Sequence, residues 1–169
     1  LGVKFQSAVS GNILGVRFYK GAANTGTHVG HLWSGSGTQL AEATFTSETA
    51  SGWQEVLFST PVPITANTTY VASYFSPAGY YAFTAGSLNT TFDNPPLRAL
   101  ANNEDGPNAV YRYNTTGFPS SNGSGANYWV DVLFTPDTPF DNTPPTVTSV
   151  APLSGATNVG LATTVTATF

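Results

Sequence analysis

Apolar side chains alternate with polar or small ones in several separate segments of residues 1–134, and this period of two predicts β-strands. Val16 and Phe18 lie two residues apart, as do Val130 and Val132, so each pair points to one side of its strand. No window carries a sustained apolar stripe of helical period. We therefore predict an all-β fold in which two antiparallel sheets pack as a β-sandwich, similar to a jelly roll.

Nine strands are expected, each bounded by the Gly, Asn, Ser and Pro residues that are typical of turns. They lie near residues 3–5, 12–19, 29–34, 40–46, 54–59, 69–75, 80–84, 110–113 and 128–134. A short helical turn is expected at residues 96–101, where Leu97 and Leu100 would share a face. Pro61 and Pro63 cannot donate ladder hydrogen bonds, so their segment should lie at an edge or a bend. The side chains predicted to lie inside are Val16, Phe18, Val56, Phe58, Val130, Val132 and Phe134.

The composition changes after residue 134 and divides the 169 residues into three parts. Residues 1–134 carry the alternating segments and form the predicted β-sandwich module. Residues 135–145 hold four of the 12 prolines and are typical of a semi-rigid linker. In residues 146–169 the alternation resumes for two strands at most, which is too little for an independent fold. We interpret this last part as the start of a second domain.

Several function classes are disfavoured by the charge and by the lack of cysteine. Charged residues make up 8% of the chain, and nine acids against five bases give a net charge of −4. Nucleic acid is therefore not an expected partner. No apolar run approaches the roughly 20 residues that span a bilayer, so no membrane insertion is expected. A disulfide framework and a cysteine nucleophile are excluded. Surfaces of Thr, Ser, Asn and Gly are typical of secreted β-modules, which predicts an extracellular or cell-surface location.

Catalysis is not expected, because no acid–base pair occurs in a recognisable motif. Serine chemistry needs a base, and the histidines are His28 and His31. Three residues apart on a strand, they point to opposite faces, so we expect one to pack near Trp33 and the other to be solvated. Glu48 is interpreted, like the other hairpin-flanking glutamates, as solvated surface. We therefore predict that the chain is not an enzyme.

A calcium site is the second kind of chemistry that the sequence suggests. Calcium takes six to eight oxygen ligands, and residues 102–108 are rich in side-chain oxygens. The candidate ligands are Asp93, Glu104 and Asp105. The alternative is a loop whose Asx turns bond its own backbone. We expect no obligatory ion and no required cofactor.

Asp131 lies between Val130 and Val132 and therefore faces away from them. An unpaired buried carboxylate costs several kcal/mol. We expect Asp131 to pair with Arg17 or Arg112.

Aromatic side chains carry the leading functional prediction, because sugars present C–H faces that stack on aromatic rings. The rings are dense between residues 74 and 129, and the alternation places about half of them in the core. Tyr128 and Trp129 alternate, so one of them should join the core and the other should not. Residues near polar loops are the better candidates for a binding site. The predicted ligand-binding residues are Tyr80, Asn108, Arg112, Tyr113, Phe118 and Trp129.

Several ordered motifs resemble a bacterial family known as domain of unknown function 4082. They include Gly52-Trp53-Gln54 and Asp105-Gly106-Pro107-Asn108. The remaining motifs are residues 2–5, 15–20, 26–33, 69–74, 110–113 and 127–134. The resemblance implies a module of a secreted multidomain bacterial protein, beside carbohydrate-active or adhesive domains. Residues 144–147 and 154–159 resemble the opening strands of a bacterial Ig-like domain.

Two functions from different classes remain open at this point. The first is a non-catalytic carbohydrate-binding module, whose partner is a polysaccharide or a cell-surface glycan bound weakly through aromatic stacking. The second is a structural or adhesive surface module that assembles with neighbouring domains or with copies of itself. In a variant of the second, the strands of residues 146–169 complete the sheet edge of a neighbour.

Overall fold

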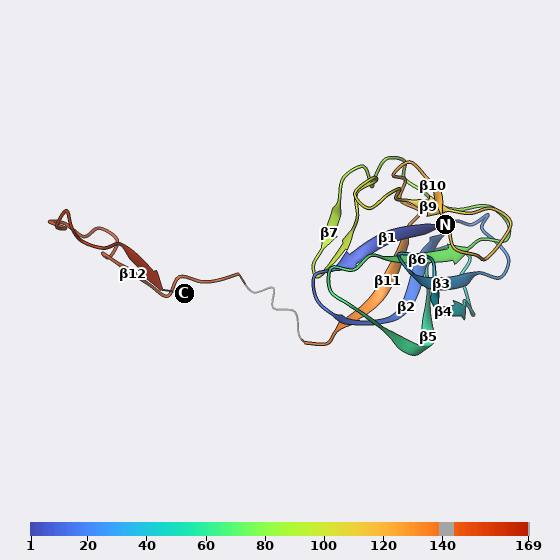
Figure 1. Ribbon diagram of the computed structural model, residues 1–169, viewed down its shortest axis with the longest axis horizontal. Coiled ribbons are helices and arrows are strands. Elements are labelled where there is room, and N and C mark those ends of the chain that lie inside the picture. Colours follow the sequence, from blue (N-terminus) through green and yellow to red (C-terminus); the bar gives the residue numbers. More distant parts are fainter. Residues whose placement is uncertain (139–143, 169) are drawn as a thin grey trace.

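The computed structural model describes residues 1–138 and 144–168, and every regular element in them is a β-strand (Figure 1). Within these residues, no helix is long and apolar enough to cross a membrane. An eight-stranded sheet has the strand order β10-β9-β1-β6-β3-β4, and the hairpin β7-β8 attaches to β1. Its strands are β1 (Gly2–Ser7), β3 (Val29–Ser34), β4 (Gln39–Thr44), β6 (Tyr70–Phe75), β7 (Phe92–Asn94), β8 (Leu97–Ala99), β9 (Val110–Tyr111) and β10 (Ser121–Asn122).

A three-stranded sheet with the order β11-β2-β5 forms the second layer. Its strands are β2 (Gly11–Lys20), β5 (Gly52–Ile64) and β11 (Val130–Pro136), and all of its pairings are antiparallel. The predicted all-β sandwich is therefore confirmed. Pro61 and Pro63 lie in the edge strand β5, as expected from their missing N–H groups.

The core lies between the two sheets and is built around Phe18 of β2. Its ring stacks on Tyr74 of β6 at 4.1 Å between centroids and meets Phe45 edge-on at 4.9 Å. Five of the seven predicted core side chains are buried, whereas Val56 and Phe134 are partly buried and pack against the core. These cross-layer contacts hold the sheets together, because aromatic pairs add to the burial of apolar area.

Two predicted elements are wrong. Residues 80–84 form no strand, and Thr84 makes a single bridge to Asn127. The aromatic alternation there finds no partner strand, and without a ladder it leaves Tyr80, Tyr81 and Phe83 exposed. The expected helical turn at residues 96–101 is instead β8, which pairs with β1 in antiparallel register. Tertiary strand pairing overrides the local spacing of Leu97 and Leu100.

Residues 144–168 contain two short strands, β12 (Ser149–Ala151) and β13 (Thr166–Thr168). They pair with each other in antiparallel register, and their side chains are exposed. The prediction of two strands at most in this part agrees with the structure. The predicted start of the linker at residue 135 is wrong, because Thr135 and Pro136 continue β11 and pair with Asn12 and Gly11 of β2. Residues 139–143 of the predicted linker and the terminal Phe169 lie outside the described residues.

Candidate functional site

A groove of about 390 Å³ lies between the segment after β6 and the segment that runs from β9 through β10. Its floor includes Ser73 and Tyr74 of β6 and His31 of β3. We call it the tyrosine groove, after the five tyrosines that line it. The side chains that line it include Tyr81, Tyr111, Arg112, Tyr113, Asn122 and Tyr128.

Four of these tyrosines, all except Tyr74, form two edge-to-face pairs. Tyr111 and Tyr113 have centroids 5.2 Å apart, and Tyr81 and Tyr128 have centroids 5.5 Å apart. Tyr113 is 72% exposed, so most of its ring is open to solvent. Burial raises the pKa of Tyr128 to about 12, so its hydroxyl keeps its proton and can donate a hydrogen bond. The groove thus combines apolar ring surface with hydroxyl donors.

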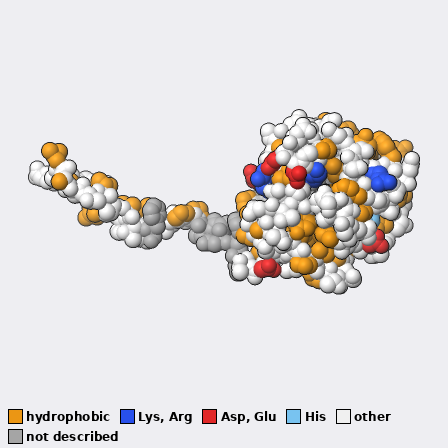
Figure 2. Space-filling view, in the orientation of Figure 1, with side chains coloured by type: hydrophobic (Ala, Val, Ile, Leu, Met, Phe, Trp, Pro, Cys, Tyr) orange, Lys and Arg blue, Asp and Glu red, His pale blue; other side chains and the backbone are white. Residues whose placement is uncertain are grey.

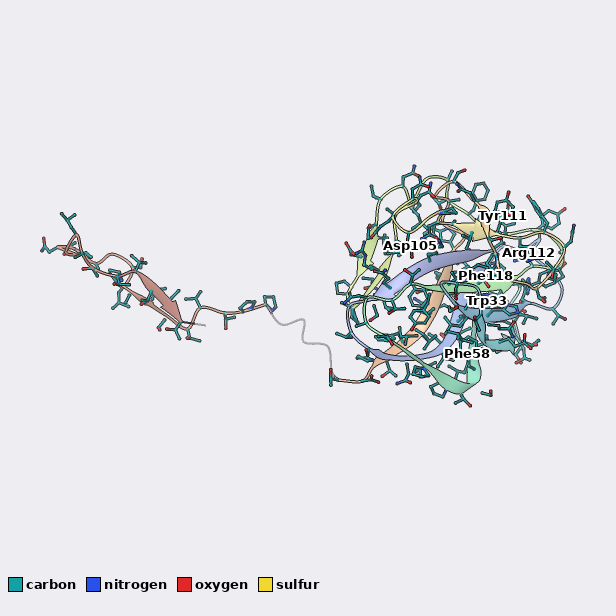
Figure 3. The ribbon with its side chains drawn as sticks, in the orientation of Figure 1. Trp33, Phe58, Asp105, Tyr111, Arg112 and Phe118 are labelled. Carbon is teal, nitrogen blue, oxygen red and sulfur yellow. The ribbon has the colours of Figure 1, made fainter. Side chains whose placement is uncertain are left out.

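A small aromatic cluster supports the groove from below. The Trp33 indole N–H donates to Ser73 Oγ at 2.8 Å, and the His31 ring stacks on Trp33 at 5.2 Å. The expected packing of one histidine near Trp33 is therefore confirmed. Burial lowers the pKa of His31, an effect that the nearby Glu42 carboxylate opposes. Phe118 packs edge-on against Trp33 at 5.7 Å (Figure 3).

The structure brings some of the predicted ligand-binding residues together. Arg112 and Tyr113 both line the tyrosine groove, and Figure 3 shows Arg112 near Tyr111 and Phe118. Phe118 lies between two lining residues, but its half-buried ring faces the Trp33 cluster. Tyr80 is 61% exposed and neighbours the lining residue Tyr81.

Asn108 does not belong with these residues, and we withdraw it from the ligand-binding set. Its side chain is fully buried, and its amide Oδ1 accepts from the Lys4 backbone N–H at 2.9 Å. Its Nδ2 donates to the carbonyls of Lys4 and Leu100 at 2.9 and 2.8 Å. A buried amide that satisfies the backbone of β1 in this way is not accessible to a ligand.

Trp129 lies on a different surface: it lines a second groove, of about 240 Å³, together with Trp53 and Asp131 from the outer face of the three-stranded sheet. Tyr19 of β2 lies opposite Trp53 of β5. On the other edge of β2, the Tyr19 backbone N–H donates to the Trp129 carbonyl. All three rings are exposed, as is Leu57. We call Tyr19, Trp53, Leu57 and Trp129 the tryptophan face. Tyr128 is buried, so the prediction that one ring of this pair joins the core is confirmed.

The predicted partner of Asp131 is also confirmed on this outer face. Arg17 donates from Nε and Nη2 to Asp131 Oδ2 at 3.0 and 2.5 Å. The Arg17 guanidinium also lies 4.9 Å from the centre of the Trp53 ring. Charge and aromatic surface therefore alternate along the outer face of β2, β5 and β11.

The three candidate calcium ligands do not form a shared site. The Glu104 carboxylate accepts from the Ala101 N–H at 3.0 Å and from Thr91 at 3.1 Å, and it pairs with Arg98. The Ala101 N–H, with Thr91 and Arg98, holds the pKa of Glu104 below its usual value. Asp93 lies opposite Arg98 in the β7-β8 pair. Within the described residues, no three His, Cys, Asp or Glu side chains gather to hold a metal ion.

A buried polar network was missed by the sequence interpretation. His28 Nδ1 and Lys20 Nζ each lie 2.8 Å from Glu48 Oε2, and His28 Nε2 lies 2.9 Å from Asn24 Oδ1. The network reaches the groove wall, where Ser76 Oγ donates to Asn24 Oδ1 at 2.6 Å. The predictions of a solvated second histidine and a solvated Glu48 are therefore wrong.

One sequence signal could have revealed this network. Alternation along β2 places Lys20 on the same face as the buried Phe18, and a lysine on a core face needs an acidic partner. Burial alone would raise the pKa of Glu48, but hydrogen bonds from Lys20 and His28 outweigh it and lower this pKa. The network is a structural element of the sandwich that ends at the groove.

Comparison with known proteins identifies the family. No curated protein sequence matches the chain. The model of the family described as Domain of unknown function (DUF4082) matches residues 1–130, which include the whole eight-stranded sheet, β2 and β5 of the second sheet, and the lining of the tyrosine groove. The chain belongs to the DUF4082 family.

Proposed function

We propose that residues 1–134 are a non-catalytic carbohydrate-binding module that holds a polysaccharide weakly in the tyrosine groove. The observation that carries this proposal is the groove itself, where five tyrosine rings and uncharged polar groups line one concave surface. A sugar ring needs an aromatic face for its C–H groups and nearby donors and acceptors for its hydroxyls. Tyr113 offers the most exposed ring, and Asn122 offers an amide on the same groove.

The energy required of the groove is small. A millimolar dissociation constant corresponds to about −4 kcal/mol. One or two stacked rings and a few hydrogen bonds can supply this net binding free energy, even after the entropic cost of association is subtracted. Weak binding suits a module whose role is to keep a larger protein on a polymer.

We further propose that the module belongs to a secreted or cell-surface multidomain bacterial protein. The support is compositional: 8% charged residues, no cysteine, and strand surfaces of Thr, Ser and Asn. Residues 137–145, which follow the end of β11, would act as the linker, and residues 146–169 as the first strands of an Ig-like domain. The proposal needs no cofactor.

Binding to polysaccharides tests the proposal. Affinity electrophoresis and calorimetry should detect at least one polysaccharide that binds the wild-type chain. Tyr113→Ala should weaken that binding about tenfold, because one stacked ring is worth on the order of 1 kcal/mol. Tyr19→Ala is the control, since it removes another exposed tyrosine ring, from the tryptophan face. Equal loss in both variants, or binding untouched by Tyr113→Ala, would refute the groove as the site.

A second candidate function rests on the tryptophan face. Four large apolar side chains stand exposed on the outer side of β2, β5 and β11, where a contiguous patch typically marks an interaction surface. Charged residues make up 8% of the chain, and Figure 2 shows few of them on the face formed by β1, β3 and β6, away from the tryptophan face. The exposed apolar side chains of the tryptophan face favour a structural or adhesive module that assembles with neighbouring domains or with copies of itself. Light scattering tests this candidate function. Assembly that depends on protein concentration and is abolished by Trp53→Ser would support it.

A further inference from the structure

The cationic side chains of the chain differ in whether they have a partner. The sequence contains five Lys and Arg residues against nine acids. Arg17, Lys20 and Arg98 form ion pairs with Asp131, Glu48 and Glu104, and Lys4 donates to the Asp105 carbonyl. Arg112 has no hydrogen-bond or ion-pair partner among the residues that the structure describes, and its side chain is exposed.

The position of Arg112 makes its lack of a partner informative. It lies on the wall of the tyrosine groove, whose lining residues include no Asp or Glu within the described part of the chain. The groove is therefore a locally cationic cavity in a chain whose net charge is −4. An unpaired cation in such a setting is suited to a negatively charged ligand group.

The backbone beside Arg112 gives its guanidinium a defined place. A Cβ atom on Gly117 would lie 3.3 Å from Arg112 Nη1 and 3.4 Å from Cζ, so the planar group rests against Gly117. The neighbouring rings Tyr111 and Tyr113 flank Arg112 in the chain and form an edge-to-face pair. An anion bound by the guanidinium would therefore sit beside an exposed aromatic face. The five N–H donors of arginine match the oxygens of a carboxylate or sulfate group.

We propose that the ligand of the tyrosine groove is an acidic saccharide, whose anionic group is bound by Arg112 while its ring stacks on Tyr113. This inference rests on the proposed carbohydrate-binding function and names its ligand class. Uronic acids and sulfated sugars both supply the required oxygens. A neutral polymer of the same backbone should bind less tightly, because it leaves the guanidinium without an anion.

Matched pairs of polymers test this proposal with the full chain. The carboxylate arm compares polygalacturonate with its methyl ester, and alginate and hyaluronan extend this arm. The sulfate arm compares dextran sulfate with dextran. We expect the wild-type chain to bind the acidic member of at least one pair at least tenfold more tightly. Added salt should weaken the acidic complex more than the neutral one, because ions screen the exposed pair.

Arg112→Gln should reduce binding of the acidic polymer about tenfold or more and reduce binding of its neutral partner by a clearly smaller factor, because only the acidic polymer loses an anionic contact. The control Arg17→Gln removes the same charge from the outer face, so it reports any effect of net charge alone. An intermediate result is expected for Gly117→Ala, which displaces the guanidinium without removing it. Unchanged melting temperatures would show that the variants are folded.

Three negative outcomes can be told apart. If acidic and neutral polymers bind equally and Tyr113→Ala weakens both, the carbohydrate-binding function stands and the acidic ligand is wrong. If Arg112→Gln and Arg17→Gln have the same effect, the binding of acidic polymers is unspecific and the assignment to Arg112 is overturned. If no polymer binds, both proposals fail.

Discussion

The Lys20–His28–Glu48 network should contribute a large part of the stability of the sandwich. The side chains of Lys20 and Glu48 are 10% and 11% exposed, and that of His28 is fully buried. Glu48→Gln removes the charge that both nitrogens face at 2.8 Å and leaves Lys20 without its counter-ion. Breaking a buried pair from one side costs about 3 to 5 kcal/mol. We expect a loss near the lower value, since Gln keeps one acceptor oxygen.

Urea unfolding at pH 7 measures this loss, and a thermal scan should show it as a drop of roughly 10 °C. Glu55→Gln is the matched control, because Glu55 is an exposed acid on β5 with no ion pair among the described residues. Its change should stay within about 0.5 kcal/mol. Equal effects of the two substitutions at pH 7 would refute the reasoning.

The pH dependence of the same contribution has a definite sign. The native pKa of Glu48 is held below its usual 4.5. A group with a lowered native pKa stabilises the folded state above its unfolded pKa and loses that contribution as the pH falls through the native pKa. The difference between wild type and Glu48→Gln should therefore be complete at pH 7 and shrink below pH 4.5. A difference that grows on acidification would contradict this account.

Three further predictions concern the groove, the domain boundary and metal dependence. Gly123→Ala should lower the free energy of unfolding by about 1 to 3 kcal/mol and weaken glycan binding, because a Cβ atom there would lie 2.5 Å from the Tyr128 hydroxyl. Gly21→Ala is the control, because a Cβ atom at Gly21 would have no neighbour within 4 Å. A fragment of residues 1–138 should melt at the same temperature as the full chain, since β12 and β13 pair with each other. A chelator should leave the melting temperature unchanged, because Arg98, Thr91 and the Ala101 N–H already occupy the Glu104 carboxylate; a calcium-reversible drop would show otherwise.

The sandwich was predictable from sequence because alternation reports burial on each strand directly. Val16, Phe18, Val130 and Val132 line up across β2 and β11, as their spacing implies. The same signal misleads at residues 80–84, where aromatic residues alternate without a strand to pair with. Periodicity describes one strand at a time, so it cannot show which segments lack a partner.

The groove was only partly predictable. Proximity to polar loops identified Arg112 and Tyr113, because loops carry exposed groups. The pairing of Tyr81 with Tyr128 depends on how distant segments meet, as does the separation of Trp129 onto another face. Asn108 was wrongly predicted to bind ligand, because an amide in a polar loop has the same sequence pattern whether it faces solvent or bonds the backbone of a neighbouring strand.

The most direct test of the central claim is an NMR titration of the full chain with oligosaccharide fragments of a polymer that it binds. A carbohydrate-binding groove predicts that the perturbed amides cluster in residues 75–81 and 111–124, and that Tyr113→Ala removes the perturbation. Perturbations confined to the tryptophan face, around Tyr19, Trp53 and Trp129, would contradict the account and move the binding site to the outer sheet.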